Sequence, residues 1–205
     1  MNARVVVITD RRLFASEEIA GRIGAIARAV PPGTVAFQVR EKDLDGGPLL
    51  RLVREVIEVA RPAGAPVWVN DRLDLALIAG ADGVQLPEDG LAIEDARAIA
   101  KRALALGASR HAEATALAAA AAGAEVVQLG PIFATPGKTP IGTAPLAIRT
   151  RMPRTTALVA VGGIDSPERA REAVRAGADA VAVIRAAWAV DDPVALVRAL
   201  VDAIQ

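Results

Sequence analysis

The sequence predicts an alternating α/β fold, a single (β/α)8 TIM barrel that spans residues 1–205 as one domain. Eight short apolar runs of strand length are separated by segments with helical character. The runs lack strict alternation of polar and apolar residues, which is typical of parallel strands buried on both faces. A doubly wound open sheet would show the same alternation of elements, but eight evenly spaced units favour closure into a barrel.

A recurring three-residue joint between helix and strand supports this interpretation. It occurs as Gly80-Ala81-Asp82, Gly123-Ala124-Glu125 and Gly177-Ala178-Asp179. Glycine is favoured just past a helix C-terminus, and an apolar run follows each joint. Such a repeated joint makes an alternating architecture more consistent with the sequence than a helical bundle.

The residues that begin and end helices and strands place the elements in order. Ser16, Glu17 and Glu18 open the first helix, and Pro31-Pro32-Gly33 ends it. The run 104–109 is the least strand-like, because leucine and alanine suit a helix as well. The predicted strands are 5–9, 35–40, 65–70, 83–86, 104–109, 126–130, 157–161 and 180–184. The predicted helices are 16–30, 49–60, 73–80, 92–103, 112–122, 167–177 and 193–204.

Composition restricts the classes of partner. The 24 basic and 24 acidic side chains cancel, so no global field attracts nucleic acid or an anionic membrane. The chain has no cysteine, which excludes disulfides and thiolate chemistry. The N-terminal apolar run is too short for a signal peptide, so we expect a cytoplasmic protein. We expect small phosphorylated molecules as partners, no nucleic acid and no membrane, and the sequence leaves a homo-oligomer open.

The turn after the seventh predicted strand has the character of a phosphate cradle. Gly162 and Gly163 follow the strand at once and allow backbone N–H groups to approach an anion closely. Asp165 or Ser166 can cap the next helix. Many (β/α)8 barrels bind phosphate after strands seven and eight. The alternative is an ordinary turn in which glycine only eases packing.

Cations and an amide cluster at the end of the second strand. Gln38, Arg40 and Lys42 are spaced at i, i+2 and i+4, so they are predicted to face the same side of the strand. Burying two cations without acidic partners costs free energy, which indicates that an anionic ligand binds there. Ion pairing with Glu41, Asp43 or Asp45 is the alternative interpretation.

Carboxylates follow the third and fourth strands. Asp71 comes after Asn70, and Asp89 comes after Glu88. Carboxylates from neighbouring strand ends can share Mg²⁺, which also bridges to substrate phosphates. Each aspartate could instead cap the helix that follows it.

Further polar residues follow the fifth and sixth strands. Ser109 and His111, the one histidine in the sequence, come after the fifth. His111 is either a proton carrier or a solvated surface group. The loop 130–140 holds Thr135, Lys138 and Thr139 and can fold over a diphosphate, or it is only a mobile surface loop.

Together these pieces resemble the thiamine phosphate synthase and thiazole tautomerase superfamily over nearly the full chain. The matching segments are 38–42 (QVREK), 69–71 (VND), 81–86 (ADGVQL), 129–138 (LGPIFATPGK), 161–164 (VGGI) and 176–183 (AGADAVAV). The synthase joins hydroxymethylpyrimidine diphosphate to thiazole phosphate through a pyrimidine-stabilised carbocation, which the thiazole nitrogen captures. The alternatives are a thiazole tautomerase, which isomerises a thiazole carboxylate phosphate, and a barrel that binds thiazole phosphate without turnover.

The resemblance implies a role for each candidate residue. Pyrimidine and diphosphate would be held by Gln38, Arg40, Lys42 and Asn70, with Ser109 and Lys138 also on the diphosphate. Asp71 and Asp89 would bind Mg²⁺. Thr135, Gly163 and the region of Ile184 would hold the thiazole phosphate, and His111 would serve a tautomerase. Three features depart from the synthase pattern: the shorter segment Gln85–Asp89, a single hydroxyl in Thr135–Lys138, and Arg185 where serine is common.

Overall fold

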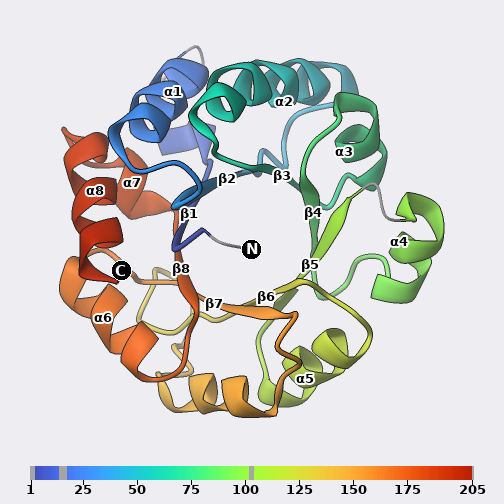
Figure 1. The fold of residues 1–205 in the computed structure, drawn as a ribbon, viewed down its shortest axis with the longest axis vertical. Coiled ribbons are helices and arrows are strands. Elements are labelled where there is room, and N and C mark those ends of the chain that lie inside the picture. Colours follow the sequence, from blue (N-terminus) through green and yellow to red (C-terminus); the bar gives the residue numbers. More distant parts are fainter. Residues whose placement is uncertain (1–2, 14–17, 102–103, 205) are drawn as a thin grey trace.

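A closed barrel of eight parallel strands forms the centre of the molecule (Figure 1). The computed structural model describes residues 3–13, 18–101 and 104–204. Each strand pairs with the next along the chain, and β1 also pairs with β8. The strands are β1 (Val5–Ile8), β2 (Val35–Val39), β3 (Val67–Asn70), β4 (Gly83–Leu86), β5 (Ala105–Arg110), β6 (Val126–Leu129), β7 (Ala157–Val161) and β8 (Ala180–Val183). The predicted (β/α)8 barrel is therefore confirmed, and the open-sheet alternative is wrong because the sheet has no free edge.

Helices surround the barrel as an outer ring (Figure 1). The α-helices are α1 (Ile19–Ala29), α2 (Gly46–Ala60), α3 (Leu73–Ala79), α4 (Ile93–Ala100), α5 (Glu113–Ala121), α6 (Pro167–Arg175), α7 (Arg185–Trp188) and α8 (Pro193–Ala203). The 3-10 helices are η1 (Arg11–Leu13), η3 (Arg61–Ala63) and η4 (Ala144–Arg151). No helix in the described ranges is long and apolar enough to cross a membrane.

Helix boundaries differ from the prediction where local chemistry overrides the apolar period. Helix α2 starts at Gly46 and takes Pro48 into its first turn, where a missing N–H costs nothing. The short helices α7 and η4 were not predicted, because α7 has only four residues and the eight residues of η4 show no clear apolar period. The predicted start at Ser16 and Glu17 and the predicted end at 102–103 lie outside the described residues.

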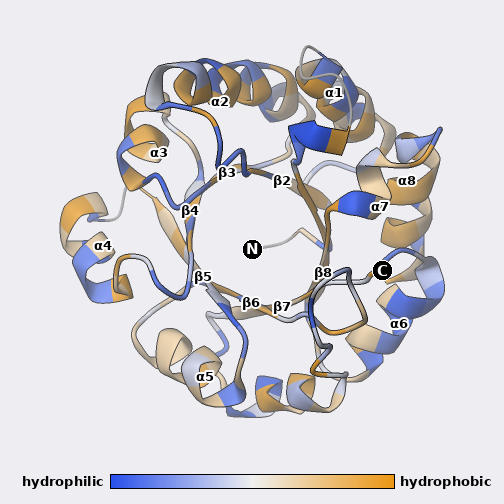
Figure 2. Ribbon diagram, turned by 180° about the vertical axis from the view of Figure 1, so that it is seen from behind, coloured by the Kyte–Doolittle hydropathy of each residue, from blue (hydrophilic) through white to orange (hydrophobic). Residues whose placement is uncertain are grey.

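Side chains fill the barrel on both faces of its strands. Outward-facing strand residues pack against the helices in the larger core, and inward-facing ones form a smaller core inside the barrel. In Figure 2 the strands are mostly apolar, while the helices carry both polar and apolar residues. Trp68 points inward, and a Cβ at Gly83 would lie 2.6 Å from its ring. The indole therefore occupies the space that a β4 side chain would fill.

The repeated joint has a structural function that explains its acid. Each of the three acids accepts a hydrogen bond from the backbone N–H at or near the start of the preceding strand, in each case at 2.8 Å. The pairs are Asp82 with Val67, Glu125 with Leu106 and Asp179 with Leu158. The glycines have φ values of +68°, +95° and +126°, the left-handed region that ends the helix. The joint thus ties consecutive parallel strands together at their N-terminal ends.

Candidate active site

A cavity of about 480 Å³ opens at the C-terminal end of the barrel. Residues that end or follow β1, β2, β5, β6, β7 and β8 line it. In (β/α)8 enzymes this end of the barrel carries the active site, because the loops there differ freely while the strands hold them in place. The position of the cavity therefore marks it as the candidate site.

The charged groups in the cavity wall leave an excess of positive charge. Arg40, Lys138 and Arg185 line the cavity, and none of them forms an ion pair with an acid in the described ranges. Asp10 and Asp165 also line it. The two aspartates are each occupied, however, because Arg12 binds Asp10 and Arg169 binds Asp165, both at 2.7 Å. An anion would meet three uncompensated cations here.

The Gly-Gly turn forms part of the same wall. Gly162 and Gly163 have φ values of +98° and +67°, and both line the cavity. A Cβ at Gly162 would lie 2.6 Å from Pro131, and one at Gly163 would lie 2.7 Å from the Ala134 carbonyl oxygen. The loop after β6 therefore packs directly onto this turn. Conformation and packing both require glycine, and the turn still presents backbone to the cavity.

The loop after β6 folds back toward the cavity rather than away from it. The Lys138 amide donates to the Thr135 carbonyl at 3.2 Å, and Gly137 between them has a φ of +74°. This tight turn brings Thr135 and Lys138 to the cavity wall together. Ile184, which directly follows β8, also lines the cavity. Four predicted phosphate-contacting residues thus share one opening: Thr135, Lys138, Gly163 and Ile184.

The end of β2 departs from the predicted geometry. The strand stops at Val39, so the alternation that would bring Lys42 inward does not continue, and Lys42 is exposed in a turn outside the cavity wall. Arg40 is half-buried and reaches the cavity. Its backbone N–H donates to the Thr9 hydroxyl at 2.9 Å, which fixes the chain where it leaves the strand.

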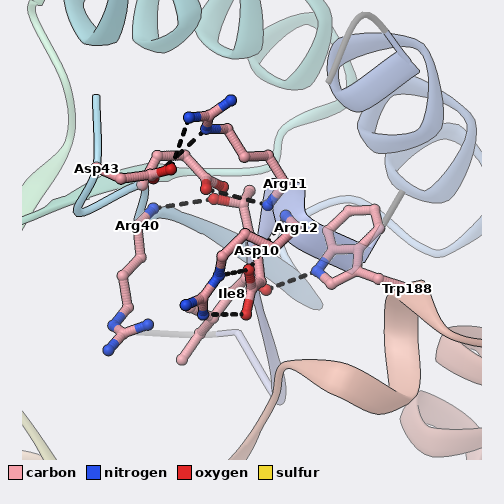
Figure 3. Close-up of polar contacts among 9 residues, drawn as sticks. Ile8, Asp10, Arg11, Arg12, Arg40, Asp43 and Trp188 are labelled. Carbon is pink, nitrogen blue, oxygen red and sulfur yellow. Dashed lines mark hydrogen bonds and ion pairs between the residues drawn. The ribbon is translucent and has the colours of Figure 1, made fainter. Parts of the chain in front are cut away.

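The acids near Arg40 are engaged elsewhere. Asp43 binds Arg11 at 2.6 Å, and the Glu41 carboxylate accepts the Arg11 backbone N–H at 3.0 Å. Figure 3 shows the Arg40 side chain pointing away from Asp43, with a dashed line only to its backbone. Arg40 is therefore not neutralised by these acids, and the alternative of ion pairing with neighbouring acids is wrong for this residue.

Amide side chains inside the barrel form a hydrogen-bonded chain across it. Gln128 donates to Gln38 at 2.7 Å, and Gln38 donates to Asn70 at 3.2 Å. In a separate pair, Gln85 donates to the Ser109 hydroxyl at 3.1 Å. Buried amides require such partners. Neither Gln38, Asn70 nor Ser109 is among the residues that line the cavity.

Two of these amides were missed as candidates by the sequence analysis. Gln85 and Gln128 occupy the same position in the similar strands GVQL and VVQL. A single glutamine inside an apolar strand run was the available signal, because a buried amide needs a partner inside the barrel.

Burial of Glu41 predicts an unusual pH dependence of stability. Burial raises the pKa of Glu41, and hydrogen bonds from Thr9 and from the Arg11 amide only partly oppose this. The stabilising contribution of this group is therefore complete below its ordinary value of 4.5 and is lost as pH rises through the raised pKa. We expect Glu41→Gln to gain stability relative to the wild type as pH rises from acidic to neutral.

Urea denaturation at several pH values checks this expectation. The free energy of unfolding of the variant minus that of the wild type should increase with pH. Glu58→Gln, on an exposed position of α2, is measured in parallel as the control for the loss of a surface carboxylate. A flat difference for Glu41→Gln would show that the carboxyl titrates alike in the folded and unfolded chains.

The two predicted metal-binding aspartates lie on adjacent loops. An ideal Cβ at Gly90 would be 3.3 Å from the Asp71 carboxylate, so Asp71 faces the loop that contains Asp89. Both aspartates are exposed and form no ion pair with a described residue. Helices α3 and α4 have no side-chain cap, so the capping alternative is wrong for both.

Two carboxylates on adjacent loops are a donor set of the kind that Mg²⁺ uses when phosphate oxygens supply further ligands. The described residues contain no cluster of three or more His, Asp or Glu side chains arranged to hold a metal. Mg²⁺ commonly takes only one or two protein carboxylates and completes its shell with water and phosphate oxygens. Asp71 has a φ of +66°, and backbone strain in a non-glycine residue often marks a functional position.

His111 connects the cavity to the loop after β4. It lines the cavity, and its Nδ1 lies 2.6 Å from the Glu88 carboxylate. Thr115 donates to the other Glu88 oxygen at 2.8 Å. Burial disfavours the Glu88 carboxylate, but the hydrogen bonds from His111 and Thr115 outweigh it and lower the pKa of Glu88. The contact with Glu88 thus holds the imidazole at the cavity wall.

Fold and site together define a class, a (β/α)8 barrel with a cation-lined cavity at the C-terminal ends of its strands. The family model described as thiamine monophosphate synthase matches residues 5–187. The chain therefore belongs to the thiamine monophosphate synthase family.

Curated and solved relatives agree with this assignment. The chain is 38% identical to the thiamine-phosphate synthase of Roseiflexus castenholzii, over 97% of this chain and 86% of that one. It is 41% identical to that of Methanoculleus marisnigri, over 86% and 84%. The solved thiamine phosphate pyrophosphorylase from Pyrococcus furiosus superposes with a TM-score of 0.88 at 30% identity, covering 99% of this chain and 96% of that chain.

Proposed function

We propose that this protein is a thiamine phosphate synthase, a transferase that joins hydroxymethylpyrimidine diphosphate and thiazole phosphate and releases diphosphate. The observation that carries the proposal is the gathering of the Gly162-Gly163 turn and three cations around one cavity, where none of the cations pairs with a described acid. A reaction with two phosphorylated substrates and an anionic leaving group needs such a surface. Family membership supports the same reaction.

The reaction begins when the C–O bond between the pyrimidine methylene and the diphosphate breaks. The electron pair leaves with the diphosphate, and the positive charge left on the methylene is delocalised into the pyrimidine. Arg40 and Lys138 stabilise the departing charge in this proposal. Lys42 is exposed and two residues after Arg40, and a contact between it and the diphosphate remains part of the proposal.

The thiazole nitrogen then gives its lone pair to the methylene carbon, and the new C–N bond forms. Thr135, Gly163 and the backbone near Ile184 would hold the thiazole phosphate while this occurs. Apolar wall residues such as Pro131 and Val161 exclude water, which would otherwise capture the carbocation. Gln38, Asn70 and Ser109, at or near the C-terminal ends of β2, β3 and β5, would position the pyrimidine in this proposal.

Magnesium, when bound, would neutralise diphosphate charge and hold it next to the cations. Asp71 and Asp89 are the residues of this chain that would hold it. Their exposed carboxylates on adjacent loops support the assignment.

A product assay tests the proposal. Purified protein incubated with both substrates and Mg²⁺ should form thiamine phosphate and diphosphate in equal amounts. Absence of both products under conditions in which a known synthase forms them would reject the proposal. Binding of thiazole phosphate without turnover would then identify the non-catalytic barrel.

A thiazole tautomerase is the second candidate, favoured by the pairing of His111 with Glu88 at the cavity. Isomerisation of a thiazole carboxylate phosphate moves protons and needs such a group. For this function, His111→Ala should reduce isomerisation by about 10²-fold or more, and the loss should be measurable by NMR of the thiazole. Unchanged isomerisation in the variant would reject a role for His111.

A further inference from the structure

Arg185 has no role in the reaction as described so far, although it is well placed for one. It follows β8 directly, it is exposed, and it lines the cavity. The two acids of the cavity wall, Asp10 and Asp165, are bound by other arginines. Its guanidinium is therefore available to a ligand.

The wall around Arg185 otherwise contains little charge. Ala182, Ile184, Ala186 and Ala189 line the cavity beside it. Among the described residues that line this side of the cavity, beyond the Gly-Gly turn, Arg185 supplies the positive charge that can balance an anion. A phosphate monoester carries close to two negative charges at neutral pH, and neutral hydrogen-bond donors alone would leave them uncompensated.

The chemistry of arginine also suits this ligand. Its planar fork donates two parallel hydrogen bonds to a phosphate, and it is less strongly hydrated than an ammonium group. Arg40 and Lys138 are assigned above to the diphosphate. The second phosphorylated substrate needs its own cation, and Arg185 is the remaining one of the three.

We propose that Arg185 recognises the phosphate ester of the thiazole substrate and makes the site selective for the phosphorylated thiazole over the free alcohol. This inference rests on the proposed function, because that function supplies the ligand. The residue acts on specificity, and the bond-forming step does not require it.

Calorimetric binding of two ligands tests the proposal without turnover. Thiazole phosphate and unphosphorylated hydroxyethylthiazole are each titrated into the wild type, Arg185→Ala, Arg185→Lys and Arg175→Ala. Arg175→Ala is the control, because it removes one exposed positive charge at the end of α6. We expect Arg185→Ala to weaken binding of the phosphorylated ligand by about tenfold or more and to leave the alcohol unaffected. The lysine variant should keep part of the affinity, and the control should behave as the wild type.

Three results would overturn the proposal: unchanged binding of thiazole phosphate to Arg185→Ala, an equal loss for both ligands, or a wild type that does not distinguish them. A failure of the proposed synthase function would give a different set of results. A protein that forms no thiamine phosphate but still loses phosphate selectivity in Arg185→Ala would reject the synthase and support the role of Arg185.

Discussion

Replacing Arg40 with alanine is expected to lower kcat/KM for thiamine phosphate formation by about 10²–10³-fold. The side chain is half-buried at the cavity wall, and its guanidinium has no acidic partner in the described ranges. The bond from its backbone to Thr9 holds it where β2 ends (Figure 3). In the proposed mechanism the substitution removes charge that acts on the departing diphosphate, so the transition state loses more stabilisation than the bound substrate does.

Steady-state kinetics on both substrates measure this effect. Arg54→Ala is the matched control, because it removes an exposed arginine from α2, away from the cavity. Arg40→Lys should fall between the wild type and Arg40→Ala, since a lysine keeps the charge but not the planar fork. If Arg40→Ala retained wild-type kcat/KM, Arg40 would not stabilise the departing diphosphate.

The second large effect is expected at Asp71. Asp71→Asn should lower kcat/KM by about 10³-fold and raise the Mg²⁺ concentration needed for half-maximal rate, because the proposed metal ligand loses its charge. Asparagine tolerates the left-handed backbone of this position, so the fold should be kept. Activity is measured across a magnesium titration, and thermal unfolding is recorded in parallel.

Asp74→Asn is the control that separates loss of a metal ligand from loss of a nearby negative charge. Asp74 lies three positions further along the chain, is exposed, and pairs with Arg72 at 2.6 Å. Its removal should leave the magnesium dependence unchanged. An active Asp71→Asn with the wild-type magnesium curve would remove Asp71 from the metal site.

Much of the fold could be predicted from local chemistry. Apolar runs identified all eight strands, and the strand over 105–110 was confirmed although leucine and alanine suit a helix. The joints at Gly80, Gly123 and Gly177 correctly indicated that helices and strands alternate along the chain. The role of their acids was not predicted, because the N–H group that each acid binds belongs to a strand well before it in the chain.

The candidate site was predicted only in part. Residues adjacent to strand ends, such as Arg40, Thr135, Lys138 and Gly163, reach one cavity as their positions indicated. Lys42 did not, since strand periodicity holds only while the chain stays extended, and β2 ends three residues earlier.

The glutamine chain illustrates a second limit. Gln128 and Gln38 meet across the barrel, 90 positions apart in sequence. Such a contact depends on closure of the whole sheet, so no local pattern can reveal it.

A crystal structure with diphosphate, magnesium and thiamine phosphate tests the central claim most directly, which is that one mouth holds both phosphorylated groups. We predict the diphosphate in contact with Arg40 and Lys138, and the thiamine phosphate ester on the Gly162-Gly163 turn within the same cavity. The claim would be contradicted if either group bound at another opening, such as the one that Arg4, Arg149 and Arg154 line.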